Sequence, residues 1–291
     1  MNDNKVDYIT QWKMPCGLTL RGYSKAAEAT YLFVPELKIS LDMGGIDKTV
    51  KSNLFFITHT HSDHAIHLPE AQPAFIDLKD PNIIFAPKQA VKYIHTYMHA
   101  SQELNSNADL NSEEVLKQKP FQVIGVSPSE TYPINHNKHE VAVFFCQHNV
   151  TSVGYGFSEV RMKLKDEYKS VPGKEIAALR KQGVEVQERT LVPLFLFLGD
   201  TNAEVFTANS ETMFSYPVII LECTFILPNH LNQASNSFHL HWSDIEPFVH
   251  KYPNVTFVLI HFSLRYKDEE IQEFFTNLKL PNVVPWLTKK Q

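Results

Sequence analysis

Four side chains that can bind a metal ion lie within six consecutive residues. The motif His59-Thr60-His61-Ser62-Asp63-His64 directly follows an apolar run, Leu54 to Thr58, that has the composition of a buried strand. Alternate side chains project the same way where a chain leaves a strand, so His59 and His61 can hold one ion while Asp63 and His64 turn toward a second. Burying three imidazoles and a carboxylate together is costly without a cation. The motif therefore predicts a binuclear metal site.

Three further candidate ligands also follow apolar strands. His148 comes after VAVFFCQ, Asp200 comes after LFLFLG, and His261 comes after TFVLI. The predicted ligand sets are His59, His61 and His148 for one ion, and Asp63, His64 and His261 for the other, with Asp200 as the bridge. Nitrogen and oxygen donors without a thiolate favour two zinc ions, with manganese and iron as alternatives.

The elements that must position these ligands are short strands and amphipathic helices. Strands are predicted at 31–34, 39–41, 54–58, 83–86, 141–146, 194–198, 218–222 and 255–261. Helical periodicity is found at 88–99, 112–118, 173–182, 243–251 and 267–278. Long series of strands with helices between and after them indicate two stacked sheets with helices outside.

Composition supports a single globular unit. The chain has 291 residues, 43% of them hydrophobic, with no internal repeat and no Pro- or Gly-rich linker, which favours one domain over 1–291. Three widely spaced cysteines support neither a disulfide framework nor a thiolate zinc site, so we expect a cytoplasmic protein, or a nuclear one in a eukaryote. We expect neither a signal peptide nor a membrane span.

Several further motifs accompany the ligands. They are Leu41-Asp42-Met43-Gly44, Leu198-Gly199-Asp200-Thr201, Leu221-Glu222-Cys223-Thr224-Phe225, His239-Leu240-His241-Trp242-Ser243 and Ile260-His261-Phe262-Ser263-Leu264-Arg265-Tyr266. With them, nearly the whole chain resembles the metallo-β-lactamase superfamily and, within it, the short plant-type form of ribonuclease Z, the tRNA 3′-processing endonuclease. This resemblance implies the α/β class and an αββα sandwich, in which two mixed β-sheets pack face to face with helices outside.

The resemblance also implies roles for individual residues. Glu222 and His241 match the pair that lies beside the metals in ribonuclease Z relatives, and His239 is kept only as a residue on the substrate side. Asp42 is expected to orient a ligand histidine. Arg265 follows the last ligand closely and can clamp a phosphate through its planar guanidinium, with a solvent-facing role as the alternative.

A basic segment stands out against the acidic remainder of the chain. Residues 161–181 contain seven basic and three acidic side chains, whereas the whole chain has a net charge of −5. The resemblance implies an inserted tRNA-binding arm at about 158–190, with candidate contacts at Lys163, Lys165, Lys169 and Lys174. A solvated helix face is the alternative interpretation of these charges.

Together these residues predict endonucleolytic removal of the 3′ trailer from precursor tRNA. A metal-bridged hydroxide is expected to attack the phosphorus, Asp63 to take the proton and His241, held by Glu222, to protonate the leaving 3′ oxygen. The resemblance also implies a homodimer, with one subunit presenting tRNA to the other. Two alternatives stay open: a metallohydrolase acting on a small phosphodiester, thioester, lactam or other ester, and a non-catalytic binding protein of the same fold.

Overall fold

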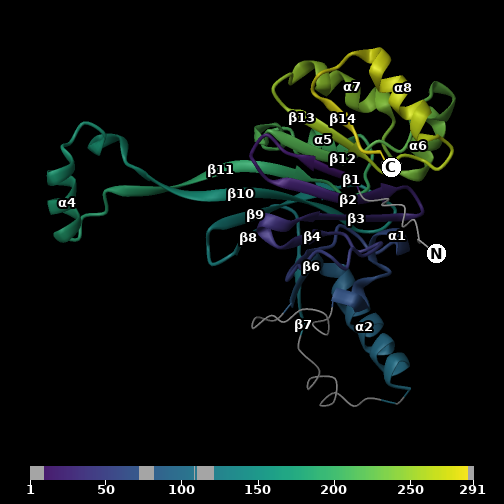
Figure 1. The fold of residues 1–291 in the computed structure, drawn as a ribbon, viewed down its shortest axis with the longest axis horizontal. Helices are drawn as coiled ribbons and strands as arrows, with labels where there is room; N and C mark the ends of the chain where they lie inside the picture. Colours follow the sequence, from purple (N-terminus) through teal and green to yellow (C-terminus); the bar gives the residue numbers. More distant parts are fainter. Residues whose placement is uncertain (1–9, 72–81, 108, 110–120, 288–291) are drawn as a thin grey trace, which may run out of the picture.

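Two β-sheets stacked face to face form the centre of the molecule. The computed structural model describes residues 10–71, 82–107, 109 and 121–287, and within this part of the chain each sheet has seven strands. Figure 1 shows the two sheets, the helices that cover them and a long arm that projects from one side. The predicted sandwich of two mixed sheets with helices outside is confirmed.

The first sheet has its strands in chain order. They are β1 (Thr10–Lys13), β2 (Thr19–Lys25), β3 (Ala29–Val34), β4 (Ile39–Leu41), β5 (Leu54–Phe56), β6 (Asn82–Pro87) and β7 (Phe121–Val126). Strands β1 to β4 pair antiparallel, and β4 to β7 pair parallel. Strands β4, β5 and β6 of the parallel half are almost entirely buried, and their residues are mostly apolar, as is typical of parallel strands covered on both faces.

The second sheet repeats this arrangement, with its antiparallel strands first in the chain and its parallel strands after them. Its strands are β8 (Thr131–Ile134), β9 (His139–Cys146), β10 (Ser152–Leu164), β11 (Gln187–Phe197), β12 (Val218–Glu222), β13 (Thr256–Ile260) and β14 (Val283–Pro285), in the order β14 to β8. Strands β8 to β11 pair antiparallel, and β11 to β14 pair parallel.

Helices cover the outer face of each sheet. The α-helices are α1 (Ser62–Ala65), α2 (Val91–Ser106), α4 (Gly173–Lys181), α5 (Glu204–Ala208), α6 (Leu231–Ser237), α7 (Trp242–Lys251) and α8 (Asp268–Leu278). Short 3₁₀ turns are η1 (Pro35–Leu37), η2 (Leu68–Ala71), η4 (Lys88–Ala90), η5 (Asp166–Tyr168), η6 (Met213–Ser215) and η7 (Pro228–His230). None of the described helices is both long and apolar enough to cross a membrane.

Three buried apolar clusters account for this layering. The central cluster lies between the sheets and includes Phe56 of β5 and Phe157 of β10, whose rings pack edge to face at 4.9 Å. A second cluster joins the outer face of β11 to β13 with α5, α7 and α8, and a third joins β5 and β6 with α1 and α2. Burial of apolar surface in all three layers is what fixes the helices on the sheets.

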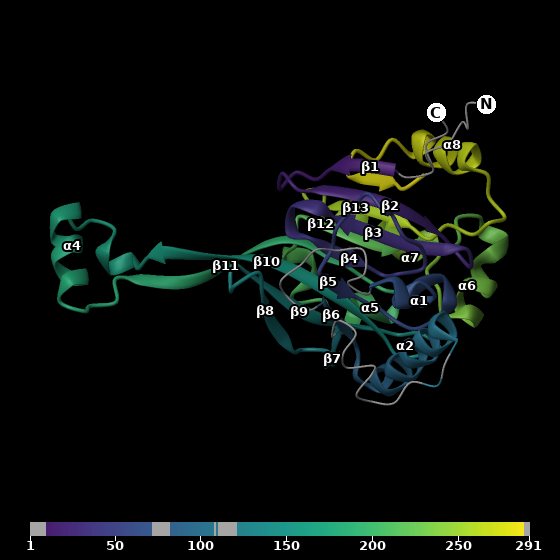
Figure 2. The same ribbon diagram turned by 60° about the horizontal axis from the view of Figure 1, so that its bottom comes forward.

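The arm is an extension of β10 and β11. The two strands pair from Tyr155–Phe197 outward to Leu164–Gln187, with a register shift at Phe157/Ser158. Their outer parts leave the body as a two-stranded ribbon that carries η5 and α4 at its tip (Figures 1 and 2). The expected insertion at 158–190 lies on this ribbon and tip.

Most of the predicted elements are present, with different ends. The helix predicted at 88–99 is η4 followed by α2, which continues to Ser106, and the helices predicted at 173–182, 243–251 and 267–278 are α4, α7 and α8. The helix predicted at 112–118 lies outside the described residues. The strands that the sequence interpretation missed are β1, β2, β7, β8, β10, β14 and the outer part of β11. On the ribbon, the charged side chains that face solvent leave no apolar alternation to predict a strand.

Candidate metal centre and active site

The seven predicted ligands meet at one edge of the sandwich. His59 follows β5, His61 lies directly before α1, and Asp63 and His64 lie on the first turn of α1. The remaining three come from the second sheet: His148 follows β9, Asp200 follows β11 and His261 follows β13. Strands that end at the same edge therefore bring together side chains that are up to about 200 residues apart in the chain.

The two predicted ligand sets form two groups in space. The first group contains His59, His61 and His148, each with one ligand atom within 4.8 Å of a ligand atom of the other two. The second group contains Asp63, His64 and His261, which meet the same criterion. In the first group, His148 Nε2 lies 3.3 Å from His61 Nδ1. In the second group, His64 Nε2 lies 3.2 Å from His261 Nε2 and 3.7 Å from Asp63 Oδ2.

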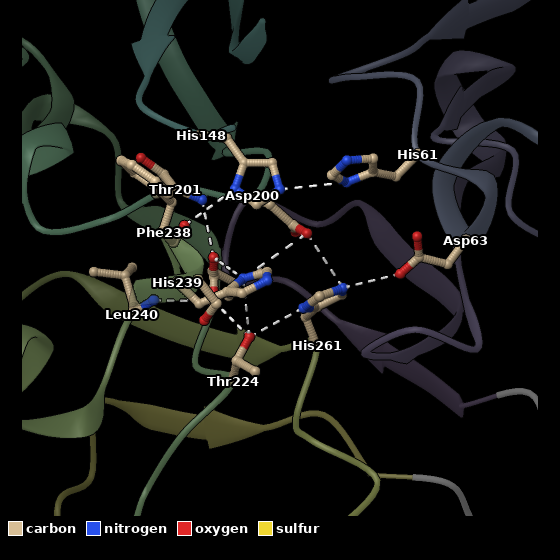
Figure 3. Close-up of polar contacts among 12 residues, drawn as sticks. His61, Asp63, His148, Asp200, Thr201, Thr224, Phe238, His239, Leu240 and His261 are labelled. Atoms are coloured by element: carbon tan, nitrogen blue, oxygen red, sulfur yellow. Dashed lines mark hydrogen bonds and ion pairs between the residues drawn. The ribbon is translucent and has the colours of Figure 1, made fainter. Parts of the chain in front are cut away.

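Asp200 lies between these groups. Its Oδ2 is 3.7 Å from His59 Nε2 in the first group, and 3.5 Å and 3.4 Å from the Nε2 atoms of His64 and His261 in the second. Figure 3 shows Asp200 pointing between His61 and His148 on one side and His261 on the other. This is the position that a bridging carboxylate requires.

Of the predicted ligands, His59 and Asp200 have pKa values that suit binding to a cation. Burial and the neighbouring His64 hold the pKa of His59 far below its ordinary value, so its imidazole is neutral. Burial raises the pKa of Asp200, but His261 and His64 outweigh burial and hold that pKa far below its usual range. His59 Nε2 is moreover buried without a hydrogen-bond partner among the described residues. A buried lone pair facing carboxylates and imidazoles fits a divalent metal ion.

Asp42 holds two ligand histidines in position. Its Oδ2 accepts a hydrogen bond from His64 Nδ1 at 2.7 Å, which turns His64 Nε2 toward Asp63 and His261. Asp42 also accepts from the Thr58 hydroxyl, which in turn lies 3.0 Å from His59 Nδ1. The backbone at Gly44 lies very close to the backbone at Asp63. A Cβ atom on residue 44 would lie 1.8 Å from the Asp63 carbonyl oxygen. Glycine is therefore required next to the motif.

Glu222 lies at the end of β12 and pairs with His239. Its Oε1 accepts from His239 Nδ1 at 2.8 Å and from the Thr201 amide at 2.9 Å. Its Oε2 accepts from the Thr224 hydroxyl at 2.6 Å and from the Leu240 amide at 3.1 Å. Burial lowers the pKa of His239, but the charge of Glu222 and its hydrogen bond outweigh burial and raise that pKa to about 9. Glu222 thus favours the protonated form of the His239 imidazole, whose Nδ1 lies 4.0 Å from Asp200 Oδ2.

The predicted pairing of Glu222 with His241 is wrong. His241 is the residue before α7, and its Nδ1 accepts a hydrogen bond from the Ser243 amide at 3.1 Å. Its Nε2 donates to the Leu227 carbonyl oxygen at 3.0 Å. Both ring nitrogens are therefore used in capping the helix and holding a loop, and neither faces Glu222.

One sequence signal distinguishes the two histidines. Asp244 lies three residues after His241 and accepts from the His241 amide, which is the spacing of a capping box. That spacing marks His241 as the helix cap and leaves His239 free for the site. Thr224 was also missed as a member of the site, although it lies two residues after Glu222.

Two plant proteins of known activity resemble this chain over most of its length. No protein-family profile matches the chain. The chain is 28% identical over 271 residues to tRNase Z TRZ1 of Arabidopsis thaliana, which covers 91% of this chain and 92% of that protein. It is 30% identical over 265 residues to the chloroplastic tRNase Z TRZ2 of the same plant, covering 89% of this chain and 72% of that protein. The chain belongs to the ribonuclease Z family.

Solved structures show that this ribonuclease Z family member has the expected fold. Human tRNase Z, short form, superposes with a TM-score of 0.52 at 15% identity, covering 91% of this chain and 95% of that chain. The metallo-β-lactamase fold protein YhfI of Bacillus subtilis superposes with a TM-score of 0.56 at 12% identity, covering 92% and 93%.

Arg265 lies beside the site of this ribonuclease Z family member. It lines a pocket of about 490 Å³ together with His239 and Thr224. Its guanidinium lies 5.8 Å from the centre of the Phe225 ring and donates to the Gln233 side chain at 2.6 Å. The guanidinium is therefore held in the pocket next to the Glu222–His239 pair.

The four candidate lysines lie elsewhere, on the outer part of the ribbon and its tip. Lys163, Lys169 and Lys174 are exposed, and Lys165 is half-buried. Lys169 forms an ion pair with Asp166. The structure thus separates these lysines from the metal centre by the length of the ribbon (Figure 1).

Proposed function

We propose that the protein is a metal-dependent endoribonuclease that removes the 3′ trailer from precursor tRNA. The single observation that carries this proposal is the Glu222–His239 pair beside two groups of metal-binding side chains. Cleavage of a phosphodiester requires protonation of a poor leaving group, and this pair supplies the acid that such chemistry needs. The names of the curated relatives, tRNase Z, indicate precursor tRNA as the substrate.

The proposed cofactor is a pair of zinc ions, one in each ligand group, with Asp200 between them. His59, His61 and His148 would hold one ion, and Asp63, His64 and His261 would hold the other; manganese and iron would offer the same chemistry. When bound, such ions supply Lewis-acid activation of a water and of the phosphate. The donor set and the unpartnered Nε2 of His59 support this assignment.

The chain's own residues supply the proton transfers. Asp63, whose side chain is more exposed than that of Asp200, accepts the proton from the attacking water. His239, held protonated by Glu222, gives its Nε2 proton to the 3′ oxygen as the phosphorus–oxygen bond breaks. The products are a tRNA that ends in a 3′ hydroxyl and a trailer with a 5′ phosphate. Arg265, held beside His239, is positioned to bind a phosphate of the substrate.

A cleavage assay tests this function directly. The purified protein should cut a precursor tRNA with a 3′ trailer at a single position, and a chelator should abolish the cut. Bis(p-nitrophenyl) phosphate serves as the small substrate in the same metal-loaded preparation. Hydrolysis of the small substrate without cleavage of the precursor tRNA would replace the proposal with a small-phosphodiester hydrolase.

The arm is proposed to bind the tRNA body. Replacing Lys163, Lys165, Lys169 and Lys174 by glutamate should weaken precursor-tRNA binding. The salt dependence of binding should also fall, by about one unit of slope for each phosphate that the variant no longer neutralises. Hydrolysis of bis(p-nitrophenyl) phosphate should be unchanged, because the lysines lie on the ribbon and its tip, away from the metal centre.

A matched control variant carries the same change in net charge on the body of the protein instead of on the arm. Lys48, Lys51, Lys251 and Lys279 are exposed on the body, and their replacement by glutamate changes the net charge by the same amount. This control should retain most of the RNA affinity. Equal losses in the two variants would show that overall charge, rather than the arm, governs binding.

We further propose a homodimer that forms through α2. Tyr93, Tyr97 and Leu104 lie on one face of this helix and are 68%, 41% and 81% exposed, and Ile66, next to α1, is 52% exposed. An apolar stripe of this kind on a helix marks an interaction surface. A second copy of the chain is the occupant that the family membership supports.

Sedimentation velocity tests the dimer. Tyr93→Glu combined with Leu104→Glu should convert a dimer into a monomer, because each glutamate places a charge in an apolar contact. Ser106→Glu, on the opposite side of the same helix, should leave the dimer intact. A wild-type protein that sediments as a monomer at micromolar concentration would overturn the proposal.

A further inference from the structure

The Thr224 hydroxyl lies between a metal-binding histidine and the Glu222–His239 pair. Thr224 is 3% exposed, and its Oγ1 is 2.6 Å from Glu222 Oε2. The same atom lies 3.1 Å from His261 Nδ1, and Figure 3 shows Thr224 and His261 side by side. The distance from Oγ1 to His239 Nδ1 is longer, 3.4 Å, and His239 Nδ1 has a shorter contact with Glu222 at 2.8 Å. The two short contacts of the hydroxyl thus join Glu222 to His261.

The directions of these hydrogen bonds follow from the donor inventory. A hydroxyl has one proton and two lone pairs, and an ionised carboxylate can only accept. Thr224 must therefore donate its single proton to Glu222. Its lone pair then accepts from His261 Nδ1–H, which leaves the lone pair of His261 on Nε2. That atom lies 3.4 Å from both Asp63 Oδ2 and Asp200 Oδ2, where a ligand atom is needed.

We propose that Thr224 is a positioning residue that fixes the Nδ1–H tautomer of His261 and thereby couples metal binding at the Asp63–His64–His261 group to the orientation of the Glu222–His239 pair. This inference rests on the proposed function for its catalytic consequence, but its effect on zinc binding does not depend on the substrate. Ligand histidines commonly donate their second ring N–H to a carboxylate, a backbone carbonyl or a water. Here a hydroxyl lies between His261 and the carboxylate of Glu222, as the Thr58 hydroxyl lies between His59 and Asp42.

The backbone supports this role. His261 adopts a left-handed conformation with φ of 60°, which is costly for a residue other than glycine. Its amide donates to the Ser24 hydroxyl at 3.0 Å, and the Ser263 amide after it donates to the Thr224 carbonyl oxygen at 3.0 Å. The segments that carry Thr224 and His261 are thus joined by both main-chain and side-chain bonds.

The test compares variants that differ only in the hydroxyl. Thr224→Val removes it with little change in shape, and Thr224→Ser retains it. Thr224→Val should weaken the binding of one of the two zinc ions by about 10- to 100-fold in competition with a chromophoric chelator, as removal of such a partner does elsewhere. Thr224→Ser should bind both ions like the wild type. Turnover of Thr224→Val on precursor tRNA should fall while its KM stays close to the wild-type value.

A spectroscopic measurement separates this role from a merely structural one. In zinc-loaded protein with ¹⁵N-labelled histidine, His261 should show a protonated Nδ1 in the wild type and in Thr224→Ser. Thr224→Val should lose the fixed tautomer. If Thr224→Val does not fold, Thr224→Ala and Thr224→Ser provide a second pair that differs only in the hydroxyl.

Two results would overturn the proposal. The first is equal zinc affinity in the variants with and without the hydroxyl, and the second is an equal loss of zinc affinity in Thr224→Val and Thr224→Ser. Failure of the wild type to cleave precursor tRNA would instead count against the proposed function alone, because zinc affinity and the histidine tautomer are measured without RNA.

Discussion

Replacing His239 by alanine should lower the turnover of precursor tRNA by about 10²- to 10⁴-fold, the usual contribution of a positioned general acid. Zinc content and RNA affinity should stay close to those of the wild type, because His239 contacts Glu222 and is not one of the proposed ligands. The measurements are single-turnover cleavage, elemental analysis and RNA binding on the same preparation. Loss of zinc from this variant would mean that His239 is a ligand rather than an acid.

His241 provides the matched control, since it lies two residues away and is more buried than His239. Because both of its ring nitrogens hold the start of α7 and the Leu227 carbonyl, His241→Ala should lower the free energy of unfolding by about 1 kcal/mol, the cost of removing a helix cap. Asparagine, a good cap, should restore most of that stability. A larger fall in turnover for His241→Ala than for His239→Ala would reverse the assignment of the acid.

Replacing Asp200 by alanine should reduce the zinc content from about two ions to about one or fewer and bring hydrolysis of both substrates below detection. Asp200 Oδ2 lies within 3.7 Å of ligand atoms from both groups, so its loss removes a donor from each and leaves neighbouring imidazoles without a counter-charge. Inductively coupled plasma analysis measures the zinc content, and the two assays measure hydrolysis of precursor tRNA and of bis(p-nitrophenyl) phosphate.

A second buried aspartate controls for unspecific damage. Asp47 is 7% exposed and pairs with Arg21 at 2.7 Å, but it is not part of either ligand group. Asp47→Asn should lower stability without changing the zinc content. An Asp200→Ala protein that keeps two ions and full activity would refute the bridging role.

The positions of the metal-binding side chains could be predicted from sequence because each follows an apolar strand. Strand ends meet at a sheet edge whatever the order of the strands, so residues such as His59 and His261 could be placed together without knowledge of the topology. The identity of the acid could not be predicted in the same way. His239 and His241 lie two residues apart, and their directions depend on where α7 begins and on the left-handed conformation of Phe238.

The insertion and its helix could be predicted from sequence, but the two strands of the arm could not, for a different reason. Its strands carry Arg161, Lys163 and Glu188 toward solvent and bury almost nothing beyond Val186 and Ile176 at the tip. Apolar alternation, the main signal for strands, is therefore missing where the ribbon leaves the body. The charged side chains therefore predict an inserted arm, but they give no signal for the strands from which the arm is built.

The ribbon also allows the spacing between tip and metal centre to change in fixed steps. β10 begins shortly after His148 and β11 ends shortly before Asp200, and between the register shift at Phe157/Ser158 and the tip the two strands pair residue by residue. Adding or removing two residues from each strand would move α4 by about 6.6 Å, twice the rise per residue of a strand, and would keep the same side chains on each face and the ligands in place. A change of one residue in one strand alone would reverse which side chains face which side. Arms of different length can thus evolve by paired insertions, which adapts the reach of the protein without altering its chemistry.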